Sequence, residues 1–228
     1  MVHEGLKKVL NGVVAATQQA GREPGSVTLI AVSKTFDAAS VREAAACGQR
    51  AFGENYIQEA VDKIGQLADL GLEWHCIGPI QSNKTRLVAE HFDWAHSVDR
   101  LKIAQRLSEQ RPEGLPPLNC CLQVNIDGGA NKAGLVPGEV AALAHEVAAL
   151  PRLRLRGLMT IPEPAARYED QLAVHRQARA LFDALRAQGL PLDTLSMGMS
   201  GDLDAAIAAG STMVRVGTAI FGGRPAKA

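Results

Sequence analysis

The sequence has no excess of charge of either sign and no long hydrophobic run. Lysine plus arginine and aspartate plus glutamate each total 24 residues, and the sequence pI is about 7.0. This composition lacks the basic footprint of a nucleic-acid-binding protein. No stretch is apolar enough to span a bilayer, and the first residues, MVHEGLKKVLNGVV, predict an amphipathic helix and not a signal peptide. We therefore expect a cytoplasmic protein that binds neither nucleic acid nor membranes.

Cysteine patterns for metal binding or redox chemistry are also missing. The four cysteines form no CxxC pair and no Cys/His zinc pattern, which predicts small buried side chains in a reducing compartment. They are Cys47, Cys76, Cys120 and Cys121. His75 and His96 have no carboxylate or further histidine at ligand spacing, so we predict no metal site.

Short β-branched or apolar runs recur along the chain and predict eight strands. Their expected ranges are 27–34, 51–55, 73–78, 93–98, 118–125, 153–161, 194–198 and 213–217. Helical patterns lie between them, and several begin at a capping residue or an N1 proline, such as Asn83, Pro137 and Asp202. The expected helices are 37–47, 56–68, 83–91, 100–110, 137–150, 167–188 and 202–209.

The alternation of strands with helices indicates a parallel sheet with right-handed crossovers. Eight such units in 228 residues favour a closed (β/α)8 TIM-type barrel, with an extra N-terminal helix, over a doubly wound sheet. The doubly wound alternative is weakened further because no GxGxxG motif follows the first strand. Since the chain shows no linker and no change of composition, we predict a single α/β domain over residues 1–228.

Polar residues stand at the ends of the first two predicted strands. In a barrel of this kind, functional groups come from the C-terminal ends of the strands. The run VTLIAVSK ends on Lys34, and the next run ends on Glu54 and Asn55. Lys34 has two interpretations, either an ordinary ion pair or an amine that forms a Schiff base with a carbonyl ligand. The position of the lysine alone does not separate them.

Glycine-containing turns follow the last two predicted strands. GMSGD places Gly198, Ser200 and Gly201 before a helix, and VGT places Gly217 and Thr218 after the eighth strand. Small residues let backbone N–H groups approach an anion, and a helix N-terminus favours negative charge. Barrels commonly bind phosphate in these two loops. Together with the lysine of the first strand, the turns indicate a small ligand that carries both a phosphate and a carbonyl.

Arg215 lies inside the last predicted strand, where an unpaired guanidinium would be costly. The residue either forms a structural ion pair or points at the ring of the ligand. In the second case its permanent positive charge would leave a pyridine nitrogen unprotonated. Such a ligand would then be a weak electron sink.

Long stretches of the sequence resemble one protein family. The segments AVSK, FGENYIQE, WHCIGPIQSNK, GLMTI, LSMGMSGDLDAAI and GSTMVRVGTAIFG are similar to the pyridoxal-phosphate homeostasis proteins, the YggS/PROSC family. The similarity runs in order from about residue 27 to residue 222. It implies a barrel like the N-terminal domain of alanine racemase, with pyridoxal 5′-phosphate (PLP) held as a Schiff base by Lys34. One segment, DGGANKAG, keeps the family's Lys-x-Gly at Lys132 and Gly134 but differs in the residues before it.

The same motifs imply roles for further residues of the cofactor site. Asn55 would line the site, Arg215 would face the pyridine nitrogen, and Met197 would lie against the cofactor. The phosphate would be held by four residues of the last two loops. These are Ser200, Gly201, Gly217 and Thr218.

Racemisation on PLP needs a second base opposite the lysine. In alanine racemase that base is a tyrosine from an additional domain of the partner subunit, and the present sequence ends soon after its eighth predicted strand. The two tyrosines, Tyr56 and Tyr168, are better explained as packing or exposed residues. The preferred function is a non-enzymatic, monomeric PLP-binding protein that stores, protects or delivers the cofactor. PLP-requiring apo-enzymes are its candidate recipients.

Two enzymatic alternatives stay open. The first is a PLP-dependent amino-acid racemase of low activity, and the second is a Schiff-base aldolase that acts on a phosphorylated sugar. The aldolase would need an acid/base group beside Lys34, for which Glu54 is the obvious candidate.

Overall fold

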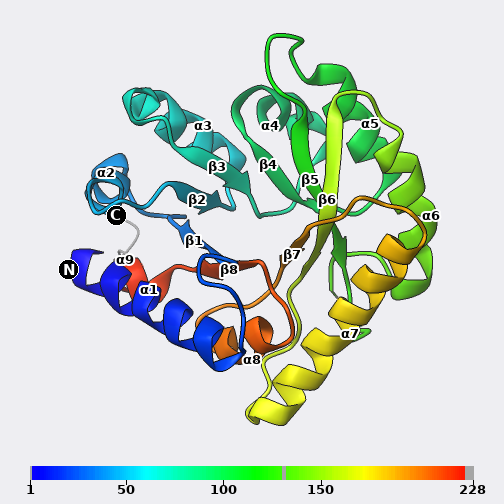
Figure 1. The fold of residues 1–228 in the computed structure, drawn as a ribbon. Helices are drawn as coiled ribbons and strands as arrows, with labels where there is room; N and C mark the ends of the chain where they lie inside the picture. Colours follow the sequence, from blue (N-terminus) through cyan, green and yellow to red (C-terminus); the bar gives the residue numbers. More distant parts are fainter. Residues whose placement is uncertain (1, 130–131, 224–228) are drawn as a thin grey trace.

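Eight parallel strands close into a barrel in the order of the chain, and β8 pairs back with β1 (Figure 1). The computed structural model describes residues 2–129 and 132–223. The strands are β1 (Thr28–Val32), β2 (Ala51–Glu54), β3 (Glu73–Cys76), β4 (Trp94–Val98), β5 (Leu118–Val124), β6 (Leu153–Thr160), β7 (Thr194–Ser196) and β8 (Met213–Val216). All eight predicted strands and the barrel itself are confirmed, with each strand end within two residues of its expected position.

Helices surround the barrel on the outside (Figure 1). They are α1 (Val2–Gln19), α2 (Ala38–Ala46), α3 (Ile57–Gln66), α4 (Thr85–His91), α5 (Leu101–Gln110), α6 (Pro137–Ala148), α7 (Tyr168–Ala187), α8 (Leu203–Ala208) and α9 (Thr218–Phe221). Two 3-10 turns are η1 (Ala68–Leu70) and η2 (Ser82–Lys84). The seven expected crossover helices correspond to α2 through α8, and α1 is the extra N-terminal helix.

The N-terminal helix packs beside α8 and α9, next to the closure of the barrel between β8 and β1 (Figure 1). A glycine makes this approach possible, because a Cβ atom at Gly5 would lie 2.6 Å from the carbonyl oxygens of Ala219 and Ile220. Helix α9 was not expected from the sequence. Its four residues make about one turn, which is too short to show a helical periodicity.

The three predicted helix starts have different outcomes: Pro137 and Asp202 lie where expected, and Asn83 does not. Pro137 is the first residue of α6, where its missing N–H costs nothing. Asn83 does not cap a helix, because it lies inside η2 and α4 begins two residues later without a side-chain cap. Asp202 precedes α8, but its carboxylate accepts hydrogen bonds from Met199 N–H and from His175 instead of capping that helix.

Two clusters of apolar side chains fill the molecule. The larger one lies between the outer faces of the strands and the helices, and includes Phe52 and Trp74. The smaller one lies inside the barrel and consists of Ile30, Ala51, Trp94, Cys121, Met159 and Met213. The barrel interior also contains fully buried polar side chains, among them His75 and His96.

Three of the four cysteines are fully buried, and burial raises the pKa of Cys76 and Cys120 to about 12 and that of Cys121 well above its ordinary value. Cys47 is half-buried, with its sulfur 3.1 Å from His3 Nδ1. Since the thiolate is the reactive form, we expect a thiol reagent to label one cysteine in the native protein and four in denaturant. Rapid labelling of a second native thiol would contradict this assignment.

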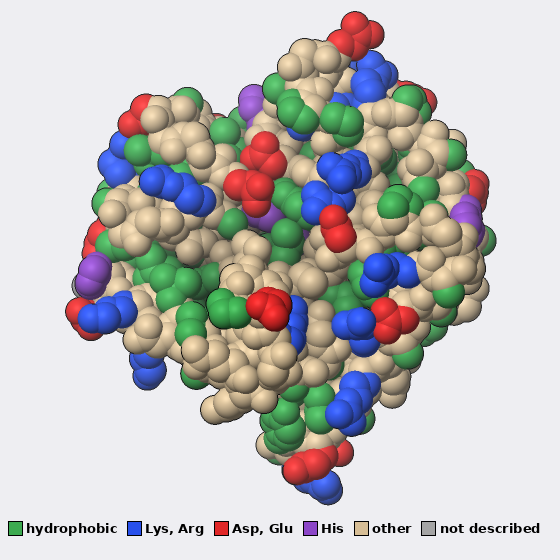
Figure 2. Space-filling view, in the orientation of Figure 1, with side chains coloured by type: hydrophobic (Ala, Val, Ile, Leu, Met, Phe, Trp, Pro, Cys, Tyr) green, Lys and Arg blue, Asp and Glu red, His purple; other side chains and the backbone are tan. Residues whose placement is uncertain are grey.

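The surface carries charges of both signs. On the face shown in Figure 2, lysine and arginine side chains are interspersed with aspartate and glutamate, and no broad patch has one sign. Within the described residues, no helix is long and apolar enough to cross a membrane. Across the same residues, no group of three or more His, Cys, Asp or Glu side chains is placed to hold a metal ion.

Candidate functional site

A cavity of about 320 Å³ opens where the C-terminal ends of the strands meet. Its lining comes from the ends of β1, β2, β3, β6, β7 and β8. The lining residues are Val32, Lys34, Phe36, Asn55, Ile77, Ile161, Met199, Ser200, Gly201, Arg215, Gly217, Thr218 and Gly222. Seven of the eight residues proposed from the sequence therefore lie around one cavity of a size typical for a small ligand.

Met197 is the proposed site residue that does not line this cavity. It is fully buried in the apolar cluster between the barrel and the helices. Successive side chains of a strand point to opposite faces, and Ser196 points into the barrel, where its hydroxyl accepts a hydrogen bond from Arg215. Met197 must therefore point outward. Met199, two residues further along, lines the cavity in its place.

Lys34 follows the end of β1 and begins a tight turn. The next residue, Thr35, has a φ of +69°, a left-handed conformation that is strained for a β-branched residue. Such strain is retained only where the surroundings enforce it, and it is common at binding and active sites. The contact that holds this conformation is a 2.8 Å hydrogen bond that Thr35 N–H donates to Glu59 Oε1.

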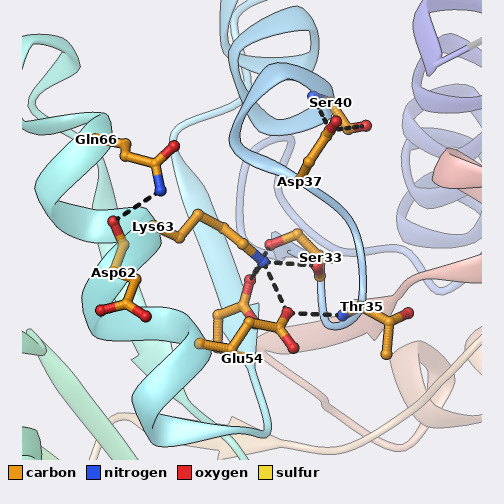
Figure 3. Close-up of polar contacts among 9 residues, drawn as sticks. Ser33, Thr35, Asp37, Ser40, Glu54, Asp62, Lys63 and Gln66 are labelled. Atoms are coloured by element: carbon orange, nitrogen blue, oxygen red, sulfur yellow. Dashed lines mark hydrogen bonds and ion pairs between the residues drawn. The ribbon is translucent and has the colours of Figure 1, made fainter. Parts of the chain in front are cut away.

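A buried ion pair holds the turn that contains Lys34, through the residues on either side of it (Figure 3). The ammonium group of Lys63, whose side chain is 4% exposed, lies 2.6 Å from Glu54 Oε1 and donates at 3.0 Å to the carbonyl oxygen of Ser33. It also pairs at 3.1 Å with Glu59, the acceptor of the Thr35 N–H. The backbone on both sides of Lys34 is thus held by one set of contacts.

Glu54 is fully buried in this set and lies outside the cavity lining. Its Oε1 accepts hydrogen bonds from both Ser33 Oγ and Lys63 Nζ at 2.6 Å. Burial raises the pKa of Glu54, and the Lys63 charge and both hydrogen bonds partly offset that effect. The Glu54 carboxylate therefore helps to hold the turn that contains Lys34. It is not placed to act on a ligand, as the aldolase alternative requires.

Asn55 reaches the cavity from the end of β2. Its backbone is approached so closely by Gly78 that a Cβ atom there would lie 2.3 Å from the Asn55 carbonyl oxygen. The Oδ1 atom of Asn55 is buried and has no hydrogen-bond partner among the residues that the structure describes. An unsatisfied amide in a cavity wall is a group that a polar ligand would satisfy.

The turn after β7 lines the cavity with Ser200 and Gly201, whose backbone N–H groups are candidate donors to a ligand. Those of Ser200 and Gly201 make no hydrogen bond to any described part of the chain. The turn is fixed by Asp202, whose Oδ1 accepts the Met199 N–H at 2.7 Å and whose Oδ2 lies 2.9 Å from His175 Nε2. The sequence suggested that helix dipoles attract an anion at this place. Because α8 and α9 contain only six and four residues, we expect the individual N–H groups of the turn to contribute more to that attraction than the dipoles do.

Gly198 determines the path of this turn. Its φ is +98°, and a Cβ atom at this position would lie 2.5 Å from Ala206 Cβ. We expect Gly198→Ala to lower the free energy of unfolding by about 1–3 kcal/mol, measured by urea denaturation. Gly201→Ala is the matched control, since a Cβ atom there meets nothing within 4 Å. Equal losses in the two variants would contradict this account of the turn.

The cavity is positively charged. Lys34 and Arg215 line it, and no carboxylate does among the residues that the structure describes. Arg215 is 5% exposed, and it donates hydrogen bonds to Ser196 Oγ at 2.7 Å and to the Thr160 carbonyl oxygen at 2.8 Å. Burial lowers the pKa of Arg215 to about 10, so the guanidinium stays charged at neutral pH. Such a cavity suits an anionic ligand.

Comparison with known proteins identifies the family. The alanine racemase N-terminal domain family matches residues 14–225. The chain is also 61% identical to the pyridoxal phosphate homeostasis protein of Pseudomonas aeruginosa, over 98% of this chain and 96% of that protein. The chain belongs to the pyridoxal phosphate homeostasis protein family. The resemblance seen in the sequence motifs is thereby confirmed.

Two solved structures show how widely the fold of this homeostasis-family barrel is shared. PipY of Synechococcus elongatus, solved with PLP bound, is 41% identical and has a TM-score of 0.84 over 97% of this chain and 100% of that chain. The alanine racemase of Corynebacterium glutamicum is 21% identical, with a TM-score of 0.67 over 94% of this chain and 60% of the racemase chain. The racemase likeness shows the fold alone.

Some residues of the homeostasis-family site were missed by sequence reasoning. Phe36, Ile77 and Ile161 complete the cavity wall, but an apolar residue near a strand end carries no signal of its own. Lys63 was missed because Glu59 and Lys63, four residues apart on α3, give the pattern of an ordinary surface ion pair. Neither tyrosine lines the cavity, with Tyr56 54% and Tyr168 46% exposed.

Proposed function

We propose that this protein binds PLP at the cavity, as a Schiff base to Lys34, and serves PLP homeostasis by storing, protecting or delivering the cofactor. The observation that carries the proposal is a lysine and a guanidinium in one cavity, beside a turn whose Ser200 and Gly201 N–H groups make no bond to the described chain, and no carboxylate among the described lining residues. The membership of the family and the PLP-bound PipY structure support it.

The lining residues fit each part of PLP. When bound, PLP supplies an aldehyde that reacts with an amine, and Lys34 offers that amine at the cavity wall. The N–H groups of Ser200 and Gly201 and the hydroxyl of Thr218 are donors for the phosphate. Gly217 lets the backbone beside them lie close to the end of β1, since a Cβ atom there would lie 3.0 Å from the Val32 carbonyl oxygen. The unpartnered Oδ1 of Asn55 and the Arg215 guanidinium remain for the polar groups of the ring.

We propose further that the bound cofactor does little chemistry on amino acids. Racemisation needs two bases on opposite faces, and Lys34 is the one side chain suited to proton transfer among the described lining residues. A guanidinium next to a pyridine nitrogen disfavours its protonation and so weakens the electron sink. A cavity open at the barrel mouth leaves the cofactor accessible to PLP-requiring apo-enzymes, which are the proposed recipients.

The proposal is tested by adding PLP to the purified protein and recording its visible absorption spectrum. We expect a new band from bound PLP, and borohydride reduction should fix a pyridoxyl group on the peptide that contains Lys34. Incubation with L-alanine in deuterium oxide should then give no appreciable exchange of the α-proton. A protein that takes up no PLP would refute the binding function, and rapid exchange would favour the racemase alternative.

A further inference from the structure

A chain of hydrogen bonds runs through the barrel interior from the candidate site to the opposite mouth. Arg215 on β8 donates to Ser196 Oγ on β7 at 2.7 Å, and Ser196 Oγ lies 2.8 Å from His96 Nδ1 on β4. His96 Nε2 lies 2.9 Å from His75 Nδ1 on β3, and His75 Nε2 lies 2.8 Å from Glu73 Oε1. Both imidazoles and Ser196 are 0% exposed, whereas the Glu73 side chain is 47% exposed.

Polar side chains are unusual at this place. The interior of such a barrel is normally packed with branched apolar side chains, and buried polar groups are costly unless every one finds a partner. Here each ring nitrogen has a partner, and the His75 ring is also stacked on Trp94 with a centroid distance of 5.4 Å. A fully satisfied buried network holds its members in a single arrangement.

The direction of every hydrogen bond in this chain is fixed by its first member. A guanidinium only donates, so Ser196 Oγ accepts from Arg215. A hydroxyl can accept a second hydrogen bond, but its own buried proton would then lack an acceptor, so Ser196 donates that proton to its remaining partner, His96 Nδ1. His96 is then a neutral ring with its proton on Nε2, which it donates to His75 Nδ1. Burial, with the nearby Arg215 charge, lowers the pKa of His96 well below its ordinary value, in agreement with a neutral ring.

The second imidazole follows the same rule. Because His75 Nδ1 accepts, its proton is on Nε2, and it is donated to the Glu73 carboxylate. That hydrogen bond lowers the pKa of Glu73, although partial burial opposes the effect. All four bonds therefore point one way, from a permanent cation at the candidate site to an anion at the other mouth. The chain is not a route for protons to a ligand, since the guanidinium at its inner end has no lone pair to accept one.

We propose that Ser196, His96 and His75 are positioning residues that hold the Arg215 guanidinium in the cavity wall through this one-way chain of donors. Ser196 is the member of the chain that contacts Arg215. The two histidines keep a lone pair on His96 Nδ1, and the Ser196 hydroxyl proton points toward that lone pair and away from the guanidinium. The role of Arg215 toward PLP rests on the proposed function. The direction of the hydrogen bonds from Arg215 to Glu73 does not rest on that function, and it can be measured in the ligand-free protein.

The first experiment is a long-range ¹H–¹⁵N correlation spectrum of the imidazoles in the ligand-free protein at neutral pH. We expect His75 and His96 both to be neutral and protonated on Nε2. A charged ring, or a proton on Nδ1 of either residue, would overturn the proposed direction. This result does not depend on whether the protein binds PLP.

The second experiment compares Ser196→Ala with Ser211→Ala. Ser211 is equally buried, but its hydroxyl bonds the carbonyl oxygens of Leu195, Met197 and Met213 and takes no part in the hydrogen-bond chain from Arg215. We expect Ser196→Ala to raise the Kd for PLP about tenfold and to shift the absorption band of the bound cofactor, because Arg215 loses one hydrogen bond from a charged donor. Ser211→Ala should keep the wild-type Kd and band.

Each outcome of this comparison has a definite meaning. Ser196→Thr, which keeps the hydroxyl, should restore both the Kd and the band toward the wild-type values. A Ser196→Ala protein with wild-type Kd and band, or equal changes in the Ser211→Ala protein, would overturn the positioning role. If the wild-type protein bound no PLP at all, the proposed function would fail, while the imidazole spectrum would still decide the direction of the chain.

Discussion

The Lys34→Ala protein is expected to show no absorption band of covalently bound PLP and no pyridoxyl group after borohydride reduction. Among the described residues that line the cavity, Lys34 alone carries an amine, so no neighbour can replace it in the reaction with the aldehyde. The measurement is peptide mapping by mass spectrometry after reduction, together with the visible spectrum at saturating PLP.

A charge-matched variant separates the covalent bond from simple attraction. Lys34→Arg keeps the positive charge but cannot form the Schiff base, so it should retain weak, reversible PLP binding and give no reduced adduct. Lys102→Ala, on the exposed side of α5, is the control and should behave as the wild type. A reduced adduct of undiminished yield in the Lys34→Ala protein would show that another lysine holds the cofactor.

The barrel and most of the site were predictable from the sequence because their signals are local. Each strand is a short apolar run between helical patterns, and the closure of eight such units brings the strand ends to one mouth. Lys34, at the end of β1, and the glycine turns after β7 and β8 then meet without any knowledge of side-chain contacts. Strand order alone thus accounts for their convergence.

What escaped prediction depends on side-chain direction and on contacts across the fold. Met197 was expected against the cofactor but points away from the cavity. Side chains alternate between the two faces of a strand, and the hydrogen bond from Arg215 is what shows that Ser196 points inward. Asp202 looked like a helix cap because its bond to His175 of α7 leaves no trace in the local sequence. The one-way chain from Arg215 to Glu73 likewise joins strands that are far apart in the sequence.

Replacing Lys63 by methionine is expected to lower the free energy of unfolding by about 3–5 kcal/mol at pH 8. The substitution keeps the apolar stem of the side chain but leaves the Glu54 carboxylate buried without its cation. It also removes the donor to the Ser33 carbonyl, so the turn that carries Lys34 should loosen and react more slowly with PLP. Urea denaturation and the rate of appearance of the PLP band measure the two effects.

The double variant Lys63→Met/Glu54→Gln tests the cause of this loss, because glutamine imitates a protonated glutamate. Burial already raises the pKa of Glu54 above its ordinary value of 4.5, and the opposing Lys63 charge and hydrogen bond are absent from the single variant. A folded-state pKa above the unfolded one means that the folded protein binds more protons, so the stability of Lys63→Met should fall as pH rises from about 4.5.

The single and double variants should therefore have similar stability at low pH, where Glu54 is protonated in both the folded and unfolded chain, and should diverge as the pH rises to 8. The double variant is the more stable one at the upper end, since it has no carboxylate to ionise in the interior. A difference between the two variants that does not change with pH would mean that lost packing, and not the uncompensated charge of Glu54, causes the destabilisation. In that case the Lys63–Glu54 pair would act on the lysine turn only through the geometry of its hydrogen bonds.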